Sequence, residues 1–236
     1  MFIHESVEIP KIKRLKDVEN FQYEDENGNQ YQSVTTFISN NWDKTYLNKW
    51  KKKVGHEKAA AISKRATTRG TGLHKQIENY LNNKEILTEG TNELVIELFG
   101  KVQPALIKIN KIKLLEKPLF SEKLKLAGTP DCIAEYNETL AVIDFKTSTR
   151  MKRKIDIINY FLQAACYGIM YEEHLQVMPE NAVIIMAVEA VDFPMLYIEP
   201  MEKCVSMLNS FIKDPIEFQN KLEIVKSRSR KGRLDY

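Results

Sequence analysis

Apolar residues recur at helical spacing over four long parts of the chain. These parts are 44–82, 92–110, 156–174 and 201–226, and each predicts an amphipathic helix. Within the first of them, Val54-Gly55 predicts a break, because glycine is a poor helix former. A shorter helix, capped by Thr35 or Thr36, is expected before it.

A second pattern, rich in β-branched and aromatic residues, predicts strands. The expected strands are 113–120, 122–127, 131–136, 139–146, Ala182–Glu189 and Pro194–Ile198. Near the N-terminus we expect a small hairpin with strands Phe21–Tyr23 and Gln30–Gln32, turned by Glu26-Asn27-Gly28-Asn29.

The order of these elements predicts an α/β fold. Helices come first, a β-meander follows, and a helix with further strands comes next, so we expect a central mixed β-sheet flanked by helices, with an N-terminal helical region. A chain of 236 residues can bury one substantial core, which favours a single domain. Its expected parts are an N-terminal hairpin and helices (1–60), the core (61–200), a C-terminal helix (201–226) and a basic tail (227–236).

The most informative polar residues lie in the stretch GTPDCIAEYNETLAVIDFK, residues 128–146. If Asn137-Glu138 is a two-residue turn, Asp131 lies opposite Asp144, with Cβ atoms roughly 4.5–5.5 Å apart. Lys146 follows two residues later and therefore projects from the same face as Asp144. The pattern predicts two carboxylates and one ammonium at one end of a hairpin.

Two carboxylates this close repel each other, so either one is protonated or a cation lies between them. Their oxygen atoms suit one or two Mg²⁺ or Mn²⁺ ions, and the lysine beside them can align a water or offset charge on a phosphate. This predicts a metal-dependent phosphodiesterase site. Two alternatives stay open. A three-residue loop would set Phe145 opposite Asp131, and a solvated surface hairpin would leave only an Asp144–Lys146 pair.

Composition adds less. A net charge of +3 is too small to indicate nucleic acid binding by itself, although basic residues gather in three clusters. The clusters are Lys49 with Lys51, Lys52 and Lys53; Arg150 with Lys152, Arg153 and Lys154; and Lys226, Arg228, Arg230, Lys231 and Arg233. The three scattered cysteines fit reduced thiols, and they are too few for a four-cysteine iron–sulfur cluster.

Targeting signals are not expected. No run approaches transmembrane length, and the first 16 residues contain Glu5 and Glu8 without an apolar stretch, unlike a signal or transit peptide. We therefore expect a cytoplasmic protein, bacterial or phage-encoded in a host cytoplasm.

Four motifs follow one another in a recognisable order. They are Arg69-Gly70 ahead of His74, Pro130-Asp131, Asp144-Phe145-Lys146, and Gln163 with Tyr167 as a QxxxY helix motif. In this order they resemble the PD-(D/E)xK nuclease superfamily and, within it, the RecB-type exonuclease branch. The resemblance spans about residues 65–170 and is weak outside them.

The resemblance implies a metal-dependent exonuclease that hydrolyses DNA, with a preference for single-stranded ends, in replication, repair or recombination. It implies that the metal is held by His74, Asp131, Asp144 and the Phe145 carbonyl, and that Lys146 aligns the attacking water. Residues expected to guide the strand are Arg69, Thr147, Arg150, Gln163 and Tyr167. Glu122 is expected to support the site from the preceding strand.

Several of these residues also fit purely structural roles. A helical histidine such as His74 is more often structural than a ligand, and Gln163 with Tyr167 also fits a solvated amide beside a half-buried ring. Gly70 and Gly72 suggest close approach of the helix to the sheet or of DNA to the helix.

Two further residue groups are expected to be structural. Trp42, Tyr46 and Trp50 fit a base-stacking ridge, but the packed face of a helix is favoured. Asp156 is expected to be an N-cap.

Two other functions remain open. A structure-specific or restriction-type endonuclease would use the same three residues. A non-catalytic DNA-binding module on a nuclease fold is the alternative of another class, and the intact Asp131, Asp144 and Lys146 argue against it.

Overall fold

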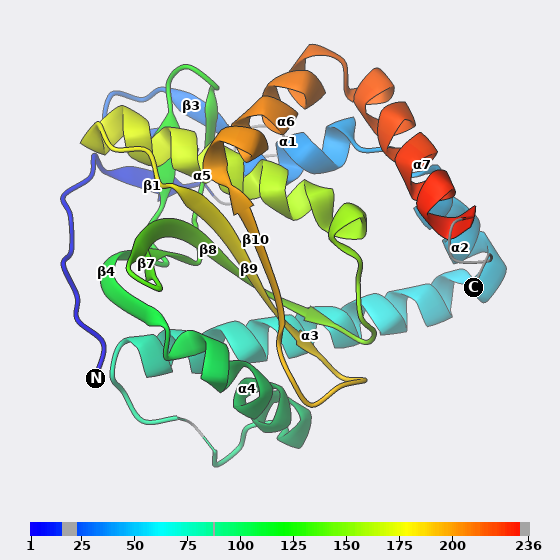
Figure 1. Cartoon of the computed structure of the whole chain (residues 1–236), viewed down its shortest axis with the longest axis horizontal. Helices are drawn as coiled ribbons and strands as arrows, with labels where there is room; N and C mark the ends of the chain where they lie inside the picture. The colour runs from blue at the N-terminus through cyan, green and yellow to red at the C-terminus, as the bar shows by residue number, and fades with distance from the viewer. Residues whose placement is uncertain (16–22, 87, 232–236) are drawn as a thin grey trace.

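The computed structural model describes residues 1–15, 23–86 and 88–231, and within them the strands form two five-stranded sheets (Figure 1). The main sheet has the order β10-β9-β8-β7-β4, and the small sheet has the order β1-β2-β3-β6-β5. The strands of the main sheet are β4 (Ile109–Leu115), β7 (Cys132–Tyr136), β8 (Thr139–Ser148), β9 (Asn181–Val188) and β10 (Met195–Pro200). Those of the small sheet are β1 (Ile12–Arg14), β2 (Tyr23–Asp25), β3 (Gln30–Ser33), β5 (Leu119–Ser121) and β6 (Leu126–Gly128). The helices are α1 (Val34–Asn41), α2 (Thr45–Val54), α3 (His56–Leu81), α4 (Glu93–Leu106), the 3₁₀ turn η1 (Lys154–Ile157), α5 (Ile158–Leu175), α6 (Met201–Lys213) and α7 (Pro215–Lys231).

The β7–β8 hairpin sets the register of the main sheet. Tyr136 pairs with Thr139, so the turn contains only Asn137 and Glu138. Both turn residues have positive φ, 49° and 67°, as in the hairpin turns whose twist matches the flanking strands. The predicted two-residue turn is therefore confirmed. Beyond it β8 runs parallel to β9, with α5 as the connecting helix.

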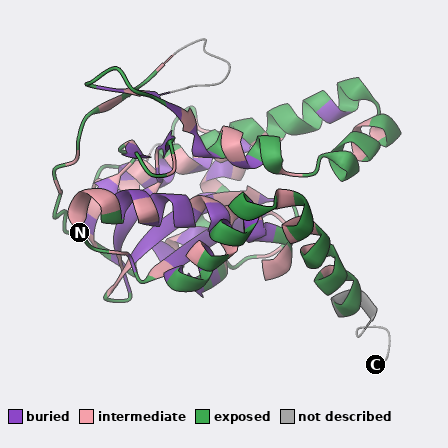
Figure 2. Cartoon of the chain, turned by 90° about the horizontal axis from the view of Figure 1, so that it is seen from above, coloured by how far each residue is buried: buried purple, intermediate pink, exposed green. Residues whose placement is uncertain are grey.

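Helices cover both faces of the main sheet. Ile143 and Phe145 of β8 pack with Leu73 of α3 and Leu98 of α4, whereas Val142 packs with residues of α5 and α6. Because side chains alternate along a strand, β8 is buried on both faces, and Figure 2 shows buried residues concentrated in the sheet and the helix surfaces against it. The predicted α/β fold with a central mixed sheet is confirmed.

The N-terminal segment runs along the outer edge of β4. The Ile112 amide donates to the Ile3 carbonyl at 2.8 Å, and the Glu5 amide donates to the Ile112 carbonyl at 2.9 Å. Residues 3–5 thereby cover part of an edge that would otherwise present unpaired backbone groups.

Two helical regions extend from this body into solvent. Figure 2 shows α2, the first part of α3, and α7 as mostly exposed. Gln219 connects α7 to the end of α1 and the loop after it. Its side chain accepts from the Asp43 amide at 2.6 Å and donates to the Asn41 carbonyl at 3.0 Å. None of the described helices is long and apolar enough to cross a membrane.

The prediction that Trp42, Tyr46 and Trp50 form the packed face of a helix is only partly right. Trp42 lies 5.8 Å from the Phe211 ring, but Tyr46 is 77% exposed, and α2 buries none of its residues in the described structure. The expectation of a packed face is wrong for Tyr46.

The strand predicted at 113–120 is wrong, because it is two strands in different sheets. Glu116 adopts φ 51° directly after β4, and Pro118 lacks the amide that would continue the ladder. The strand predicted at 122–127 is largely a turn, and only β6 from Leu126 onward is extended.

The helix predicted at 201–226 is also wrong as a single element. It ends before Asp214, whose carboxylate accepts from the amides of Ile216 and Glu217, and Pro215 begins α7. The cap of α1 is Ser33, since its hydroxyl accepts from the Thr36 amide.

Asp156 is not an N-cap. It lies inside η1, and its carboxylate accepts from the Arg153 guanidinium at 2.8 Å. Phe21 of the predicted N-terminal hairpin and residues 232–236 of the predicted basic tail lie outside the described residues.

Candidate active site

The hairpin brings the predicted carboxylates to one end of the main sheet. The ladder ends with Cys132 paired to Ile143, so Asp131 and Asp144 are the next residues on each strand. The Phe145 amide donates to Asp131 Oδ2 at 2.7 Å, which ties the start of β7 to β8. Asp144 Oδ1 accepts from Lys146 Nζ at 2.5 Å. The structure thus brings the three predicted residues of the hairpin together.

Asp144 has an unused ligand atom. Its side chain is buried, and Oδ2 has no hydrogen-bond partner among the described residues. Burial raises the pKa of this carboxyl above its usual range, although the Lys146 ammonium opposes the rise. A buried oxygen left without a partner is costly unless a ligand or ion satisfies it.

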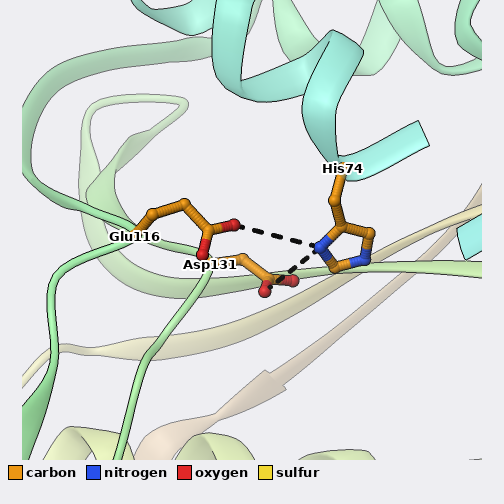
Figure 3. A group of neighbouring side chains, drawn as sticks. All are labelled: His74, Glu116 and Asp131. Atoms are coloured by element: carbon orange, nitrogen blue, oxygen red, sulfur yellow. Dashed lines mark ion pairs between the residues drawn. The ribbon is translucent and has the colours of Figure 1, made fainter. Parts of the chain in front are cut away.

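His74 extends from α3 toward Asp131 and Glu116 (Figure 3). Its Nε2 lies 2.8 Å from the Phe145 carbonyl oxygen, and a carbonyl can only accept, so Nε2 carries the hydrogen. Nδ1 therefore faces the carboxylates, 3.4 Å from Asp131 Oδ1. Burial lowers the pKa of His74, but the hydrogen bond and charge of Asp131 outweigh it and raise the pKa to about 8.

Glu116 completes this group and was missed from the sequence. Leu115 pairs with Cys132, so Glu116 lies beside Asp131, and its amide donates to the Asp131 carbonyl at 3.1 Å. Its Oε1 lies 4.0 Å from His74 Nδ1. The Glu116 side chain is 37% exposed, and its partial desolvation together with the neighbouring Asp131 charge raises its pKa to about 7. The available signal was Pro118, which ends a strand and would have placed the glutamate in a loop at this edge.

These side chains suit a divalent metal ion. One ligand atom from each of His74, Glu116 and Asp131 lies within 4.8 Å of the others, and Asp144 Oδ2 is a further buried oxygen. Carboxylate oxygens match Mg²⁺ or Mn²⁺, and the imidazole favours Mn²⁺. The Phe145 carbonyl, expected as a ligand, is the acceptor of the His74 ring. That is the usual support of a metal-binding histidine.

Lys146 is held as a cation. Its Nζ contacts Asp144 and lies 5.0 Å from the centre of the Tyr160 ring. Burial lowers the pKa of Lys146, but the Asp144 and Asp131 carboxylates outweigh it and raise the pKa above its usual value. The ammonium can therefore donate hydrogen bonds but cannot act as a base near neutral pH.

The QxxxY pair lies beside this group, but its tyrosine has a structural position. The Tyr167 side chain is buried, and its hydroxyl accepts from Gln163 Nε2 at 3.3 Å. A Cβ atom on Gly128 would lie 2.9 Å from both Cε1 and Oη of the ring. Tyr167 was expected to guide the strand, but its ring is covered because it packs against the segment that precedes Asp131. Gln163 is half-buried.

Four other expected residues lie in different surroundings. Arg69 is buried and paired with Glu189, so it does not face an incoming strand. Thr147 is half-buried beside α3, and Arg150 is exposed. Glu122 lies at the far end of the β5–β6 turn, where its amide donates to Glu173 at 3.1 Å, and it does not reach the metal-binding group.

Of the two glycines of α3, only Gly72 is required by a close approach, whereas a side chain at Gly70 would make an ordinary contact. A Cβ atom on Gly72 would lie 2.7 Å from Val95 Cγ2 of α4, so this glycine lets two helices touch. At Gly70 the nearest atom would be Thr147 Oγ1 of β8, at 3.9 Å.

Comparison with known proteins gives a family for this geometry. The family model described as the PD-(D/E)XK nuclease superfamily matches residues 41–230. Mitochondrial genome maintenance exonuclease 1 of Mus musculus is 29% identical over 149 residues, which cover 60% of this chain and 44% of that protein. The protein of the same name from Xenopus tropicalis is 26% identical over 189 residues, covering 75% and 53%. The chain therefore spans about half the length of the curated relatives it matches.

Proposed function

Because this chain belongs to the PD-(D/E)XK nuclease superfamily, we propose that it is a metal-dependent deoxyribonuclease that digests DNA from single-stranded ends. The observation that supports this best is the convergence of His74, Glu116 and Asp131 beside the Asp144–Lys146 pair. The curated relatives are named exonucleases, and this favours action at ends.

The metal would be Mg²⁺ or Mn²⁺, held by His74, Glu116, Asp131 and Asp144. Such an ion, when bound, stabilises charge on a phosphate oxygen and makes water a better nucleophile. Protein side chains must orient the phosphate and hold the attacking water in line with it.

Lys146 is proposed to align the attacking water and to offset negative charge on the phosphate. Its ammonium is charged and fixed between Asp144 and the Tyr160 ring, so it is oriented before substrate arrives. A preorganised donor in a partly buried site contributes more than the same donor in water.

The DNA strand is proposed to approach over β8 and the start of α5. Gln163 and Thr147 are half-buried next to the site, and the exposed guanidinium of Arg150 follows β8. An amide, a hydroxyl and a guanidinium can all bind phosphate oxygens without reading sequence.

The test is digestion of 5′- and 3′-labelled oligonucleotides, single-stranded and duplex, in Mg²⁺ and in Mn²⁺. We expect wild-type protein to shorten single strands from an end, and Asp144→Ala and Lys146→Ala to lose at least about a hundredfold in rate. Glu138→Gln removes a carboxylate from the opposite end of the same hairpin and should keep the wild-type rate. Wild-type rates in both site variants would refute the assignment.

Two further substrates separate the alternatives. An exonuclease leaves a covalently closed single-stranded circle intact, whereas an endonuclease of the same fold cuts it. A non-catalytic binding module would hold the oligonucleotide in chelator and leave it uncut after metal is added.

A further inference from the structure

A buried guanidinium lies on α3 five residues before His74. The Arg69 side chain is only 6% exposed, and it pairs with the Glu189 carboxylate. Its Nε atom is buried without a hydrogen-bond partner among the described residues. A buried charge of this kind costs free energy unless it is paired. The Arg69–Glu189 contact therefore allows this part of α3 to pack with Arg69 buried.

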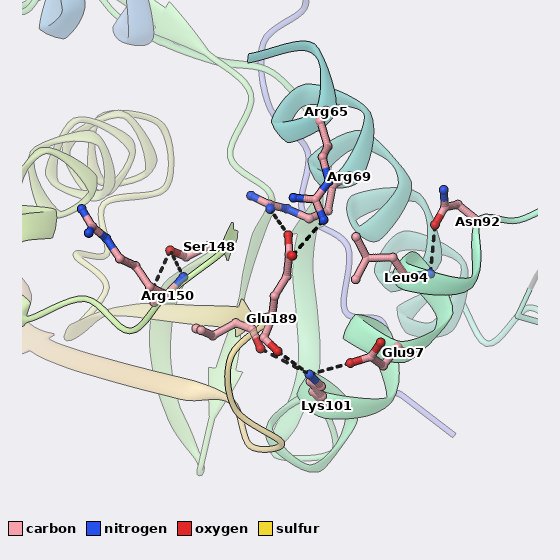
Figure 4. Close-up of polar contacts among 10 residues, drawn as sticks. Arg65, Arg69, Asn92, Leu94, Glu97, Lys101, Ser148, Arg150 and Glu189 are labelled. Carbon is pink, nitrogen blue, oxygen red and sulfur yellow. Dashed lines mark hydrogen bonds and ion pairs between the residues drawn. The ribbon is translucent and has the colours of Figure 1, made fainter. Parts of the chain in front are cut away.

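Glu189 joins the elements that surround the site (Figure 4). Its carboxylate also accepts from Arg65 at 2.9 Å, one helical turn before Arg69. Its amide donates to the Ser148 carbonyl at 2.9 Å, at the end of the strand that contains Asp144 and Lys146. Its own carbonyl accepts from Lys101 of α4 at 3.1 Å. One residue therefore contacts β8, α3 and α4.

The part of α3 before Arg69 has only one buried residue, Ala59, in the described structure. Within the whole helix the buried residues are Ala59, Arg69, Leu73, Gln76, Ile77, Asn79 and Leu81, so apolar burial fixes mainly the second half. Gly70 and Gly72 lie between Arg69 and His74, and each weakens a helix by about 1 kcal/mol relative to alanine. His74 lies between the buried Leu73 and Ile77, and the Arg69–Glu189 pair is the polar anchor just before it. The orientation of His74 therefore depends on this pair as well as on the apolar core.

We propose that Glu189 is a positioning residue for the metal centre: by holding Arg69 and Arg65, it fixes the His74 imidazole against the end of β8. The proposal rests on the proposed function, since it assumes that His74 binds the metal. It gives Arg69 a role through Glu189 in place of the expected contact with DNA.

The test measures Mn²⁺ affinity directly, by the electron paramagnetic resonance signal of free Mn²⁺, so it does not depend on nuclease activity. Glu189→Gln keeps the size of the side chain and removes its charge, and we expect the dissociation constant for Mn²⁺ to rise about tenfold. Glu199→Gln is the matched control, because Glu199 is a comparably buried carboxylate between two cations, Lys154 at 2.7 Å and Lys203 at 2.9 Å. It should bind Mn²⁺ as the wild type does.

A simple loss of negative charge near the site would also weaken cation binding, and the His74→Ala background separates the two causes. A charge effect persists in that background, whereas a positioning effect acts through His74 and disappears. We therefore expect His74→Ala and His74→Ala/Glu189→Gln to bind Mn²⁺ equally. The same fold-loss in both backgrounds, or wild-type affinity in Glu189→Gln, would overturn the proposal.

If Glu189→Gln does not fold, Glu189→Asp decides. It keeps the charge but is one methylene shorter, and we expect weaker Mn²⁺ binding from it in the wild-type background only. A wild-type chain that binds no Mn²⁺ at all would overturn both this proposal and the metal dependence proposed above. A wild type that binds Mn²⁺ beside an unaltered Glu189→Asp would overturn this proposal alone.

Discussion

The two nitrogens of the His74 ring have different environments, and this difference decides what the residue can do. Nε2 donates to the Phe145 carbonyl, which fixes the ring, while Nδ1 faces Asp131 and Glu116. Without metal, a proton on Nδ1 is stabilised by those carboxylates. With metal, that proton must leave. Metal ion and proton therefore compete for one position.

This competition predicts that metal affinity rises with pH. The pKa of His74 is raised to about 8 and that of Glu116 to about 7, so both are largely protonated at pH 6 and largely deprotonated at pH 9. We expect the Mn²⁺ affinity to increase on the order of tenfold or more between pH 6.5 and 8.5 and then to level off. Calorimetry in buffers of different ionisation enthalpy should detect proton release near pH 7. An affinity that stays flat over this range would contradict the arrangement of Nδ1.

The Tyr160 ring gives a second prediction for a single residue. The Lys146 ammonium lies over it at 5.0 Å, and such a contact contributes about 0.5–2 kcal/mol. Tyr160→Leu should therefore lower the rate of strand cleavage by about two- to thirtyfold, whereas Tyr160→Phe, which keeps the ring, should stay near wild type. Equal loss in both variants would mean that the hydroxyl, and not the ring, is what matters.

The site residues that could be predicted from the sequence are those of the β7–β8 hairpin. Asp131, Asp144 and Lys146 follow from strand period and turn length, which are local properties. Glu116 was missed because it comes from a neighbouring strand whose end was misplaced. The burial of Arg69 could not be foreseen, because its partner, Glu189, is distant in sequence and meets it only in the folded chain.

At the scale of elements, the β7–β8 turn is the feature on which the site depends. A turn one residue longer would shift the register and move Asp131 away from Asp144. Asn137 and Glu138 hold the short turn despite positive φ at both positions, which is unfavourable for a glutamate.

Glu138→Gly should therefore stabilise the protein. Glycine adopts positive φ without a steric cost, and we expect a gain of about 0.5–1 kcal/mol in the free energy of unfolding, measured by denaturant titration. Glu122→Gly is the comparison, since Glu122 also lies in a turn but does not itself adopt positive φ, and it should gain nothing. A destabilised Glu138→Gly protein would show that the glutamate side chain makes a contribution that outweighs the backbone strain.

Helices were easier to predict than strand ends. The break between α2 and α3 follows from Gly55 alone, whose φ is 88°. The break at Asp214-Pro215 had an equally local signal, an acidic residue before a proline, but the apolar period continues across it. The division of 113–120 between two sheets is a tertiary effect, since which strand pairs with which is not encoded in a run of apolar residues.

At the scale of the whole molecule, the exposed helices place basic residues away from the packed core. α2 ends with Lys51, Lys52 and Lys53, and none of its residues is buried in the described structure. Trp50, Lys51 and Val54 are half-buried, whereas Lys52 and Lys53 are exposed, so their ammonium groups can reach a phosphate.

Lys52→Ala/Lys53→Ala should therefore bind a single-stranded oligonucleotide more weakly and with less salt dependence. The slope of the logarithm of the binding constant against the logarithm of the salt concentration should become shallower by about 0.7 for each phosphate that the variant no longer neutralises. Lys84→Ala/Lys108→Ala, two exposed lysines near the other end of α3, is the matched control. Both variants should unfold at the wild-type temperature. Unchanged affinity and slope in the first variant would exclude α2 from the DNA-binding surface.

The contact between Gly128 and Tyr167 places one volume constraint on two distant motifs. The ring occupies the space that any side chain at position 128 would need. An enlarged residue at 128 is therefore tolerable only with a smaller one at 167, and the two positions should be varied together in any engineered library. In such a library, surviving clones would show a negative correlation between the side-chain volumes at the two positions, a signature obtained from sequencing alone.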